Sequence, residues 1–182
     1  MLKKYILISF FTFPLFFACE VNPLKQAEEE ATKSSKEFFH WYSKNKKELL
    51  EKRKAIVFVD DDGFYAVNMF KIDEYVAFLN ESGKFSDDFI QKEKDYWLGE
   101  CLDIVFKTQK EGTKSETIAF PCQFEENPFY FSSENLTDNH INNLIMKTDS
   151  ISLETAILNY ENHNLKLHNK DGKWKVMDWA TN

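Results

Sequence analysis

The residues best suited to chemistry in this 182-residue chain are its three cysteines, Cys19, Cys101 and Cys122. A thiol can carry a lipid, form a disulfide, bind a metal or act as a nucleophile. The sequence contains no Cys-x-x-Cys pair, and no histidine lies close in sequence to Cys101 or Cys122. This spacing favours lipid attachment or a disulfide over redox chemistry or nucleophilic catalysis.

Cys19 follows a segment with the features of a bacterial export signal. Two lysines at positions 3 and 4 form a basic start, an apolar run covers residues 5–17, and the small residue Ala18 precedes the cysteine. The apolar run is too short to cross a bilayer comfortably. Residues 1–18 are therefore predicted to be a signal peptide that is absent from the mature protein.

Residues 15–19, LFFAC, resemble a bacterial lipobox, with Phe16 where leucine is usual. In that motif the cysteine receives diacylglycerol and becomes the new N-terminus, so Cys19 is the predicted lipidation site. The implied partner is a lipid bilayer reached through the acyl chains, each buried methylene contributing about 0.8 kcal/mol. The alternative is an ordinary secretory signal that is cut near Ala18.

The charge of the chain argues against nucleic acid as a partner. Removal of residues 1–18 leaves 21 basic and 30 acidic side chains, a net charge of about −9. An acidic surface gains nothing from anionic headgroups, so the acyl chains must supply the membrane attachment. Residues 19–25 are expected to form a lipidated tether and residues 26–182 a single domain, because 43% apolar and 16% aromatic side chains suffice for a core.

Cys101 and Cys122 are candidates for a disulfide once Cys19 carries a lipid. In an oxidising envelope compartment, a pair of thiols in a small exported domain is more often bridged than free. The alternative is two buried free thiols. A bridge requires Cα atoms within about 4.4–6.8 Å of each other. The sequence does not give this distance, so both alternatives stay open.

No metal or cofactor is expected. The histidines are scattered, at positions 40, 140, 163 and 168, and the last two should lie on opposite faces of a strand. Asp60, Asp61 and Asp62 before Gly63 suggest calcium, but alignment with an EF-hand loop puts Phe58 where the first carboxylate is needed. Phosphate-loop and dinucleotide motifs are absent from a chain with only five glycines.

The first half of the chain carries helical patterns. A first helix is expected at about residues 26–52, a second at 71–81, and a third that starts after Ser86 and fades near residue 107. Residues 107–117 carry no apolar period and predict a loop. The first helix has one stripe with steps of four and three residues: Ala31, Ser35, Phe38, Tyr42, Asn45 and Leu49.

Strand patterns surround and follow these helices. Residues 55–68 predict a hairpin around an Asp-Gly turn, and prolines among aromatic residues predict an irregular connector from residue 118. Four later runs predict an antiparallel meander with turns at 149–150, 161–162 and 170–172: residues 143–148, 152–160, 164–169 and 173–179. Alternation in the last hairpin, with Trp174 on the apolar side, predicts one buried face. Helices packed on a curved antiparallel sheet define an α+β fold.

Five motifs resemble a known family: residues 38–42 (FFHWY), 75–79 (YVAFL), 82–89 (SGKFSDDF), 124–129 (FEENPF) and 171–176 (DGKWKV). They look like a family of bacterial exported proteins of unknown function with a nuclear transport factor 2-like, or cystatin-like, domain. The resemblance covers about residues 30–180. It implies a long helix across a strongly bent sheet, forming a cone that can hold a ligand, and no known activity.

Cone-shaped domains of this kind sometimes house acid–base enzymes, in which desolvation shifts the pKa of a carboxylate and a tyrosine. Tyr42, Tyr75 and Glu93 fall on or near inward faces. The plainer interpretation makes the tyrosines core aromatics and Glu93 a solvated helix residue. No catalytic residue is therefore predicted.

Two classes of function follow. The first is a lipid-anchored, non-enzymatic domain of the bacterial cell envelope, on the periplasmic face or the cell surface, that holds a small ligand or an envelope protein. The alternative is an acid–base enzyme with its site in the cone. An enzyme needs a convergent polar pair with a shifted pKa, whereas a binding domain needs shape and an exposed patch.

Overall fold

The computed structural model describes residues 22–122, 136–160 and 163–181. The helices are α1 (Pro23–Lys54), α2 (Met69–Ser82), α3 (Asp87–Tyr96), α4 (Leu102–Lys110) and α5 (Asp138–Asn143), with a π-helical turn η1 (Trp97–Cys101) and a 3-10 turn η2 (Ser115–Thr117). The strands are β1 (Val57–Val59), β2 (Tyr65–Val67), β3 (Lys147–Ile151), β4 (Thr155–Tyr160), β5 (His163–Lys170) and β6 (Lys173–Thr181).

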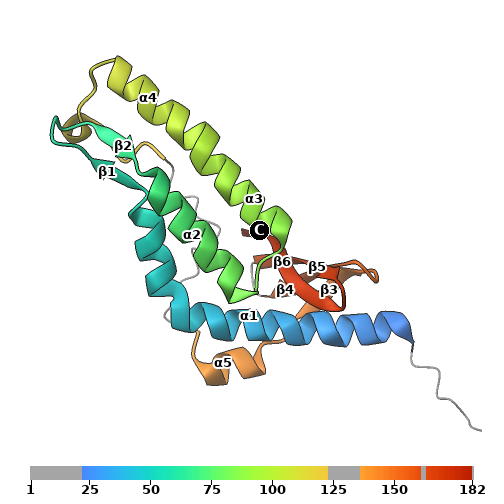
Figure 1. The fold of residues 1–182 in the computed structure, drawn as a ribbon. Helices are drawn as coiled ribbons and strands as arrows, with labels where there is room; N and C mark the ends of the chain where they lie inside the picture. The colour runs from blue at the N-terminus through green and yellow to red at the C-terminus, as the bar shows by residue number, and fades with distance from the viewer. Residues whose placement is uncertain (1–21, 123–135, 161–162, 182) are drawn as a thin grey trace, which may run out of the picture.

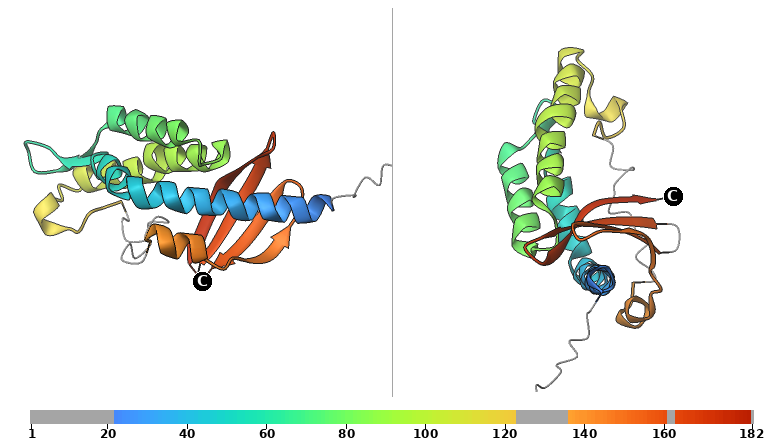
Figure 2. Two further views of the ribbon diagram at one scale, coloured as in Figure 1. Left: turned by 90° about the horizontal axis from the view of Figure 1, so that it is seen from below. Right: turned by 90° about the vertical axis from the view of Figure 1, so that its right-hand side faces the viewer.

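Helix α1 joins a helical part of the molecule to a sheet part (Figure 1). Its first half lies across the four-stranded sheet, and its second half runs beside α2 (Figures 1 and 2). The sheet has the order β3-β4-β5-β6, with every pair antiparallel, and β1 and β2 form a separate hairpin. Helices packed on an antiparallel sheet make this an α+β fold, as the sequence predicts.

Helix α1 starts earlier than predicted. Asn22 caps it, because its side-chain oxygen accepts a hydrogen bond from the Leu24 backbone N–H at 3.0 Å, and Pro23 occupies the first turn. Residues 23–25, which the predicted tether at 19–25 includes, are therefore helical. The helix begins at its cap, close to Cys19 in sequence.

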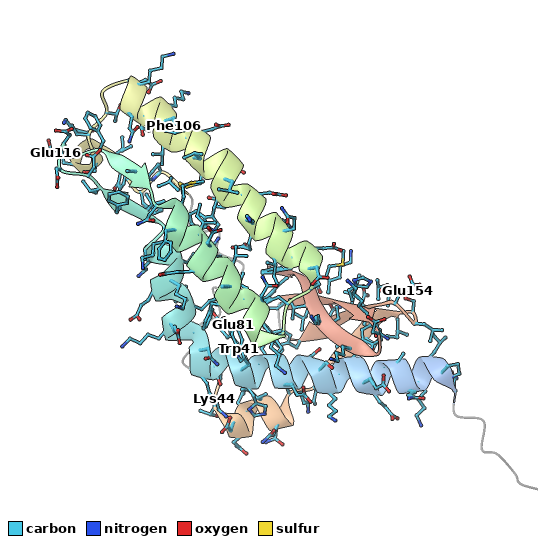
Figure 3. The ribbon with its side chains drawn as sticks, viewed as in Figure 1. Trp41, Lys44, Glu81, Phe106, Glu116 and Glu154 are labelled. Carbon is cyan, nitrogen blue, oxygen red and sulfur yellow. A yellow bond between two sulfur atoms is a disulfide. The ribbon has the colours of Figure 1, made fainter. Side chains whose placement is uncertain are left out.

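The predicted stripe of α1 is largely confirmed. Five of its six members are buried, while Asn45 is half-buried and donates to the Trp41 carbonyl at 2.8 Å. The helix bends near Lys44 (Figures 1 and 3). Two side chains bond backbone carbonyls about one turn back at this point, those of Ser43 and Asn45. The bend lets one helix serve both parts of the molecule.

The predicted hairpin at residues 55–68 is confirmed as β1 and β2. Gly63 has a φ of 82°, and the Asp60 side chain accepts a hydrogen bond from the Phe64 backbone N–H at 2.8 Å. Asp60 therefore shapes the turn. Glycine supplies the positive φ that this turn requires.

The second and third predicted helices are confirmed with shifted ends. Gly83 ends α2 with a φ of 64°, and the Ser86 hydroxyl caps α3 by accepting from the Phe89 N–H at 3.2 Å. The third helix continues through η1 into α4, so the predicted loop at 107–117 starts only after Lys110. The Gln109 side chain donates to the Tyr65 carbonyl at 2.7 Å, and this contact with β2 holds the last turn of α4.

Two predicted boundaries in the sheet are wrong. Residues 138–143 form α5, because Thr137 accepts from the His140 N–H at 3.2 Å as a helix cap, and β3 starts only at Lys147. The predicted turn at 149–150 is a register shift within β3. The chain turns at Ser152 instead, whose hydroxyl accepts from the Thr155 N–H at 2.8 Å.

A bulge in β6 keeps the aromatic side chains of this strand on one face. Leu167 pairs with Val176 and Lys166 with Asp178, so Met177 is an extra residue. Trp174 and Val176 before the bulge and Trp179 after it are all buried. The one-residue shift explains how side chains at even and odd positions reach the same core.

The edge of β6 is covered next to α3. The Ser86 N–H donates to the Val176 carbonyl at 2.8 Å, and the Val176 N–H donates to the Lys84 carbonyl at 2.9 Å. The link between α2 and α3 therefore adds a short parallel bridge to the sheet. This contact brings the start of α3, the last hairpin and the middle of α1 together.

Candidate functional site

Three polar side chains from three helices meet inside the helical part. The Tyr75 hydroxyl of α2 donates a hydrogen bond to Oε2 of Glu93 on α3 at 2.8 Å. Nη2 of Arg53, at the end of α1, lies 3.7 Å from the same oxygen. Tyr75 is 0% exposed, Arg53 4% and Glu93 8%, so a charged pair and a phenol are buried together.

Each member is positioned by the apolar face of its helix. Tyr75 shares the buried face of α2 with Ile72 and Leu79. Glu93 lies on the buried side of α3. The Arg53 guanidinium is 5.4 Å from the ring centroid of Trp97, which adds a cation–π contact. The three groups thus link α1, α2 and α3 to one another.

Burial raises the pKa of the Tyr75 hydroxyl well above its ordinary value of 10, and the charge of Glu93 raises it further. The Arg53 charge opposes this shift only in part. Tyr75 is therefore protonated at neutral pH and serves as a hydrogen-bond donor. Such a phenol is a weak general acid, because efficient catalysis needs a pKa near the working pH.

The structure brings only two of the three acid–base candidates into contact, Tyr75 and Glu93. Tyr42 lies on the sheet side of the bend, with ring centroids 6.0 Å from Phe38 and 5.8 Å from Trp179. The interpretation of Glu93 as a solvated helix residue is wrong, because Arg53 and Tyr75 compensate its burial.

Sequence reasoning missed Arg53, although a signal was present. It is the only arginine in a chain with 23 basic residues. Arginine is preferred over lysine in buried ion pairs, because its guanidinium is weakly hydrated and offers several donors in one plane. A single arginine in a lysine-rich chain is thus a reasonable candidate for a buried ion pair.

A second candidate site is a pocket of about 250 Å³ between α1, the α2–α3 link and the β5–β6 hairpin. We call it the hairpin pocket. Its buried apolar lining comes from Phe38, Leu167, Trp174 and Val176. Its polar lining includes Glu37, Lys84, Lys173 and Lys175. An apolar lining with a few charged groups is typical of small-ligand sites.

The charged residues of the hairpin pocket favour an anion. Lys84 is paired with Glu37 at 3.2 Å, and this ion pair joins α1 to the α2–α3 link. Lys173 and Lys175 add two further positive charges from β6. The pocket is therefore net positive in a chain whose overall charge is negative.

Trp174, which lines the hairpin pocket, carries a buried polar atom. Trp174 is 7% exposed, and its Nε1 is buried without a hydrogen-bond partner among the described residues. Asn169 lies opposite Trp174 on β5, and its side-chain oxygen is likewise buried without a hydrogen-bond partner among the described residues. A buried donor and acceptor left unpaired are costly, and a bridging water that bonds them would recover that energy.

A second pocket, of about 210 Å³, lies at the start of α3. Asp87 pairs with Lys170 across it, with their charged atoms 2.8 Å apart. The hydrogen bond from Lys170, followed by its charge, lowers the pKa of Asp87. Both side chains are more than half exposed, so this pair contributes little to stability. Asp87 also offsets the positive charge near this pocket.

Cys101 and Cys122 lie at disulfide distance, as their pairing requires. Their Sγ atoms are 1.93 Å apart and their Cα atoms 5.2 Å apart. Both residues are buried, at the end of η1 and in the connector that follows η2. A buried, bridged pair supports the fold and offers no exposed thiolate for chemistry.

The structure shows how the residues considered as metal ligands are arranged. Among residues 22–122, 136–160 and 163–181, no group of three or more His, Cys, Asp or Glu side chains is arranged to hold a metal ion. His40 contacts Asp138 at 2.8 Å and joins α1 to α5. His163 stacks on Tyr160 with ring centroids 5.2 Å apart.

Several predicted features lie outside the described residues: the signal peptide at 1–18, the lipidation site Cys19, and the motif at 124–129. Within the described part of the chain, no helix combines the length and apolar content needed to cross a membrane. Comparisons with protein-family models, curated proteins and solved structures found no match.

Proposed function

We propose that this chain is a bacterial cell-envelope lipoprotein, anchored through acyl chains on Cys19, whose domain binds a small anionic ligand without catalysing a reaction. The observation that carries the proposal is the hairpin pocket, with its apolar lining and its lysines. The lysines would bind an acidic group, and the apolar side chains would contact the rest of the ligand.

The size of the pocket limits the ligand. A cavity of about 150 Å³ holds a benzene ring. A pocket of about 250 Å³ therefore suits one ring, or an aliphatic group of similar size, together with an acidic substituent. A ligand of roughly ten heavy atoms is expected to bind with a Kd of about 1 mM.

The proposal includes the nuclear transport factor 2-like architecture. Its support is the long helix α1, whose first half lies across the antiparallel sheet (Figure 2). Helix α1 contacts β3, β4 and β6, as a helix that covers one face of a sheet must. An experimental structure in which α1 does not cross the sheet would contradict this part.

A titration with phenylacetate, and with 2-phenylethanol as its neutral counterpart, tests the binding site. The indole N–H signal of Trp174 in NMR spectra reports on the pocket. We expect phenylacetate to shift this signal and to bind about two- to fivefold more tightly than the alcohol, the range for a partly exposed charge pair.

Matched lysine variants complete the test. Lys173→Gln is expected to weaken the preference for the carboxylate, whereas Lys47→Gln should keep it, because the Lys47 side chain is 90% exposed on α1 and does not line the pocket. Failure of both compounds to shift the Trp174 signal would contradict the proposed site. An equal loss of the preference for phenylacetate in the two variants would contradict the role of Lys173.

One observation favours the alternative, an acid–base enzyme: the contact between Tyr75 and Glu93. The two candidates predict opposite effects on stability. Replacement of catalytic groups often stabilises a protein, because active sites hold polar groups in strained or poorly solvated places. If the cluster is structural, Tyr75→Phe and Glu93→Gln should both lower the free energy of unfolding. Stabilisation by both changes would favour the enzyme.

A further inference from the structure

The start of α1 limits how far the domain can lie from a lipid on Cys19. Asn22 is the cap of α1, and its Cα lies three Cα-to-Cα steps along the chain from that of Cys19. Three extended residues span at most about 11 Å. If Cys19 carries acyl chains, the first turn of α1 is therefore held at the membrane surface.

The β3–β4 turn lies at the same end of the molecule as the start of α1. The Thr148 hydroxyl of β3 donates a hydrogen bond to the Glu28 carboxylate, which lies in the second turn of α1. Glu154, in the turn that follows β3, points away from the sheet at the end where α1 begins (Figure 3). Two segments far apart in sequence thus share one end.

Two exposed leucines lie at this end. Leu24 is 44% exposed in the first turn of α1, and Leu153 is 56% exposed in the β3–β4 turn. At the opposite end of the molecule, beyond the bend in α1, Phe106 lies on α4 near the tip (Figure 3). Phe70 at the start of α2 is 67% exposed in the helical part of the molecule.

We propose that the end formed by Leu24 and the β3–β4 turn faces a neutral bilayer, with Leu24 and Leu153 in its interfacial layer and the helical part directed away. This inference rests on the proposed lipid anchor at Cys19. Each leucine side chain that leaves water adds to the attachment by the acyl chains. The domain is then held in one orientation.

The charges near this end select neutral lipids. Glu28, Glu29 and Glu30 follow one another in the first turns of α1, and Lys25 lies 4.0 Å from Glu29. Three carboxylates against one lysine give a net negative end. Anionic headgroups repel such charges within a Debye length of about 10 Å.

Single thiols carrying an environment-sensitive fluorophore test the orientation in the full lipidated chain. The labelled variants are Leu24→Cys, Leu153→Cys and, as the control, Phe70→Cys. The protein is inserted into phosphatidylcholine vesicles that contain a headgroup spin label. Leu24 lies next to the anchor by covalent connection, so Leu153 decides the question.

We expect the spin label to quench the fluorophore at Leu153→Cys and Leu24→Cys about twofold or more beyond that at Phe70→Cys, because only the first two sites lie in the interface. Anionic lipid added at low salt should reduce the quenching at Leu153→Cys. Equal quenching at positions 153 and 70 in a lipidated protein would overturn the orientation. A mass without the lipid would instead contradict the anchor, so the two failures are distinguishable.

Discussion

Arg53 joins α1 to α3 in the helical part through a buried ion pair. Its guanidinium lies 3.7 Å from Glu93 and stacks over Trp97. Removal of one partner of a buried ion pair leaves the other charge uncompensated and costs about 3–5 kcal/mol. We expect Arg53→Met to lower the free energy of unfolding by that amount in urea denaturation.

The matched control is Lys52→Met, one residue earlier, whose side chain is 30% exposed and pairs with Glu48 on the same helix at 3.5 Å. Pairs of this kind contribute only about 0.3–0.5 kcal/mol. A double variant, Arg53→Met with Glu93→Met, should be less destabilised than the single Arg53→Met. Equal effects of Arg53→Met and Lys52→Met would show that the pair is not buried as described.

Tyr75 predicts a dependence of stability on pH. In the unfolded chain a tyrosine ionises near pH 10, whereas the pKa of Tyr75 in the folded protein is raised well above that value. The folded state thus retains a proton that the unfolded state loses. The stabilisation is fully present below about pH 10 and is lost as the pH rises toward the folded pKa.

We therefore expect the free energy of unfolding to fall more steeply above about pH 10 in the wild type than in Tyr75→Phe, by up to about 1.4 kcal/mol per pH unit. Denaturant titrations at several pH values measure this difference. Parallel curves for the two proteins would contradict a buried, protonated Tyr75.

Trp174 tests the packing of the last hairpin. Its side chain is 7% exposed, while the neighbouring Lys173 is exposed. Trp174→Ala is expected to cost about 3–5 kcal/mol, the range for a large buried aromatic, and Lys173→Ala less than about 0.5 kcal/mol. Urea unfolding of both variants measures the contrast, and similar values for the two would contradict the hairpin as described.

At the level of elements, the Cys101–Cys122 pair closes a segment that holds α4, η2 and part of the connector. The sequence separation is 21 residues. In the chain-entropy model, a bridge over such a loop contributes about 3 kcal/mol. The double variant Cys101→Ala with Cys122→Ala should lose that amount relative to the oxidised protein.

The unmodified protein provides the control. It should resist alkylation under native conditions until it is reduced, because both cysteines are bridged and buried. Two thiols that react freely in the exported, oxidised protein would contradict the pairing.

Sequence patterns could predict those elements that depend only on residues close together in the chain. The stripe of α1, the Gly63 turn and the alternation in β5 and β6 each depend on neighbouring residues, and each was predictable. The ends of α1 and α4 were less so. The start of α1 depends on a cap at Asn22, and the end of α4 depends on the Gln109 contact with β2.

The buried cluster of Arg53, Tyr75 and Glu93 depends on contacts that a sequence pattern does not reveal. Tyr75 and Glu93 could be named from their inward faces, but their contact with each other and with Arg53 depends on how three helices pack. The bulge at Met177 is similar, because the register of β5 and β6 places Trp179 in the core against a strict alternation. Both features arise from tertiary structure.

At the level of the whole molecule, one bent helix connects a predicted membrane end to the rest of the protein. A helix of 32 residues spans about 48 Å if it is straight. The bend near Lys44 folds its second half into the helical part (Figure 3). The hairpin pocket lies beside the middle of α1, at Ser34, Glu37 and Phe38. A ligand bound there would remain accessible on an anchored protein.

The mass of the mature N-terminus tests the central claim, that Cys19 anchors this binding domain, most directly. In the wild type, we predict a chain that starts at Cys19, carries acyl groups and sediments with the membrane fraction. In Cys19→Ala, the acyl mass should be absent, and the protein should be released or keep its signal. A wild-type chain cut near Ala18 without added lipid, or a variant with unchanged mass increment and fractionation, would contradict the account.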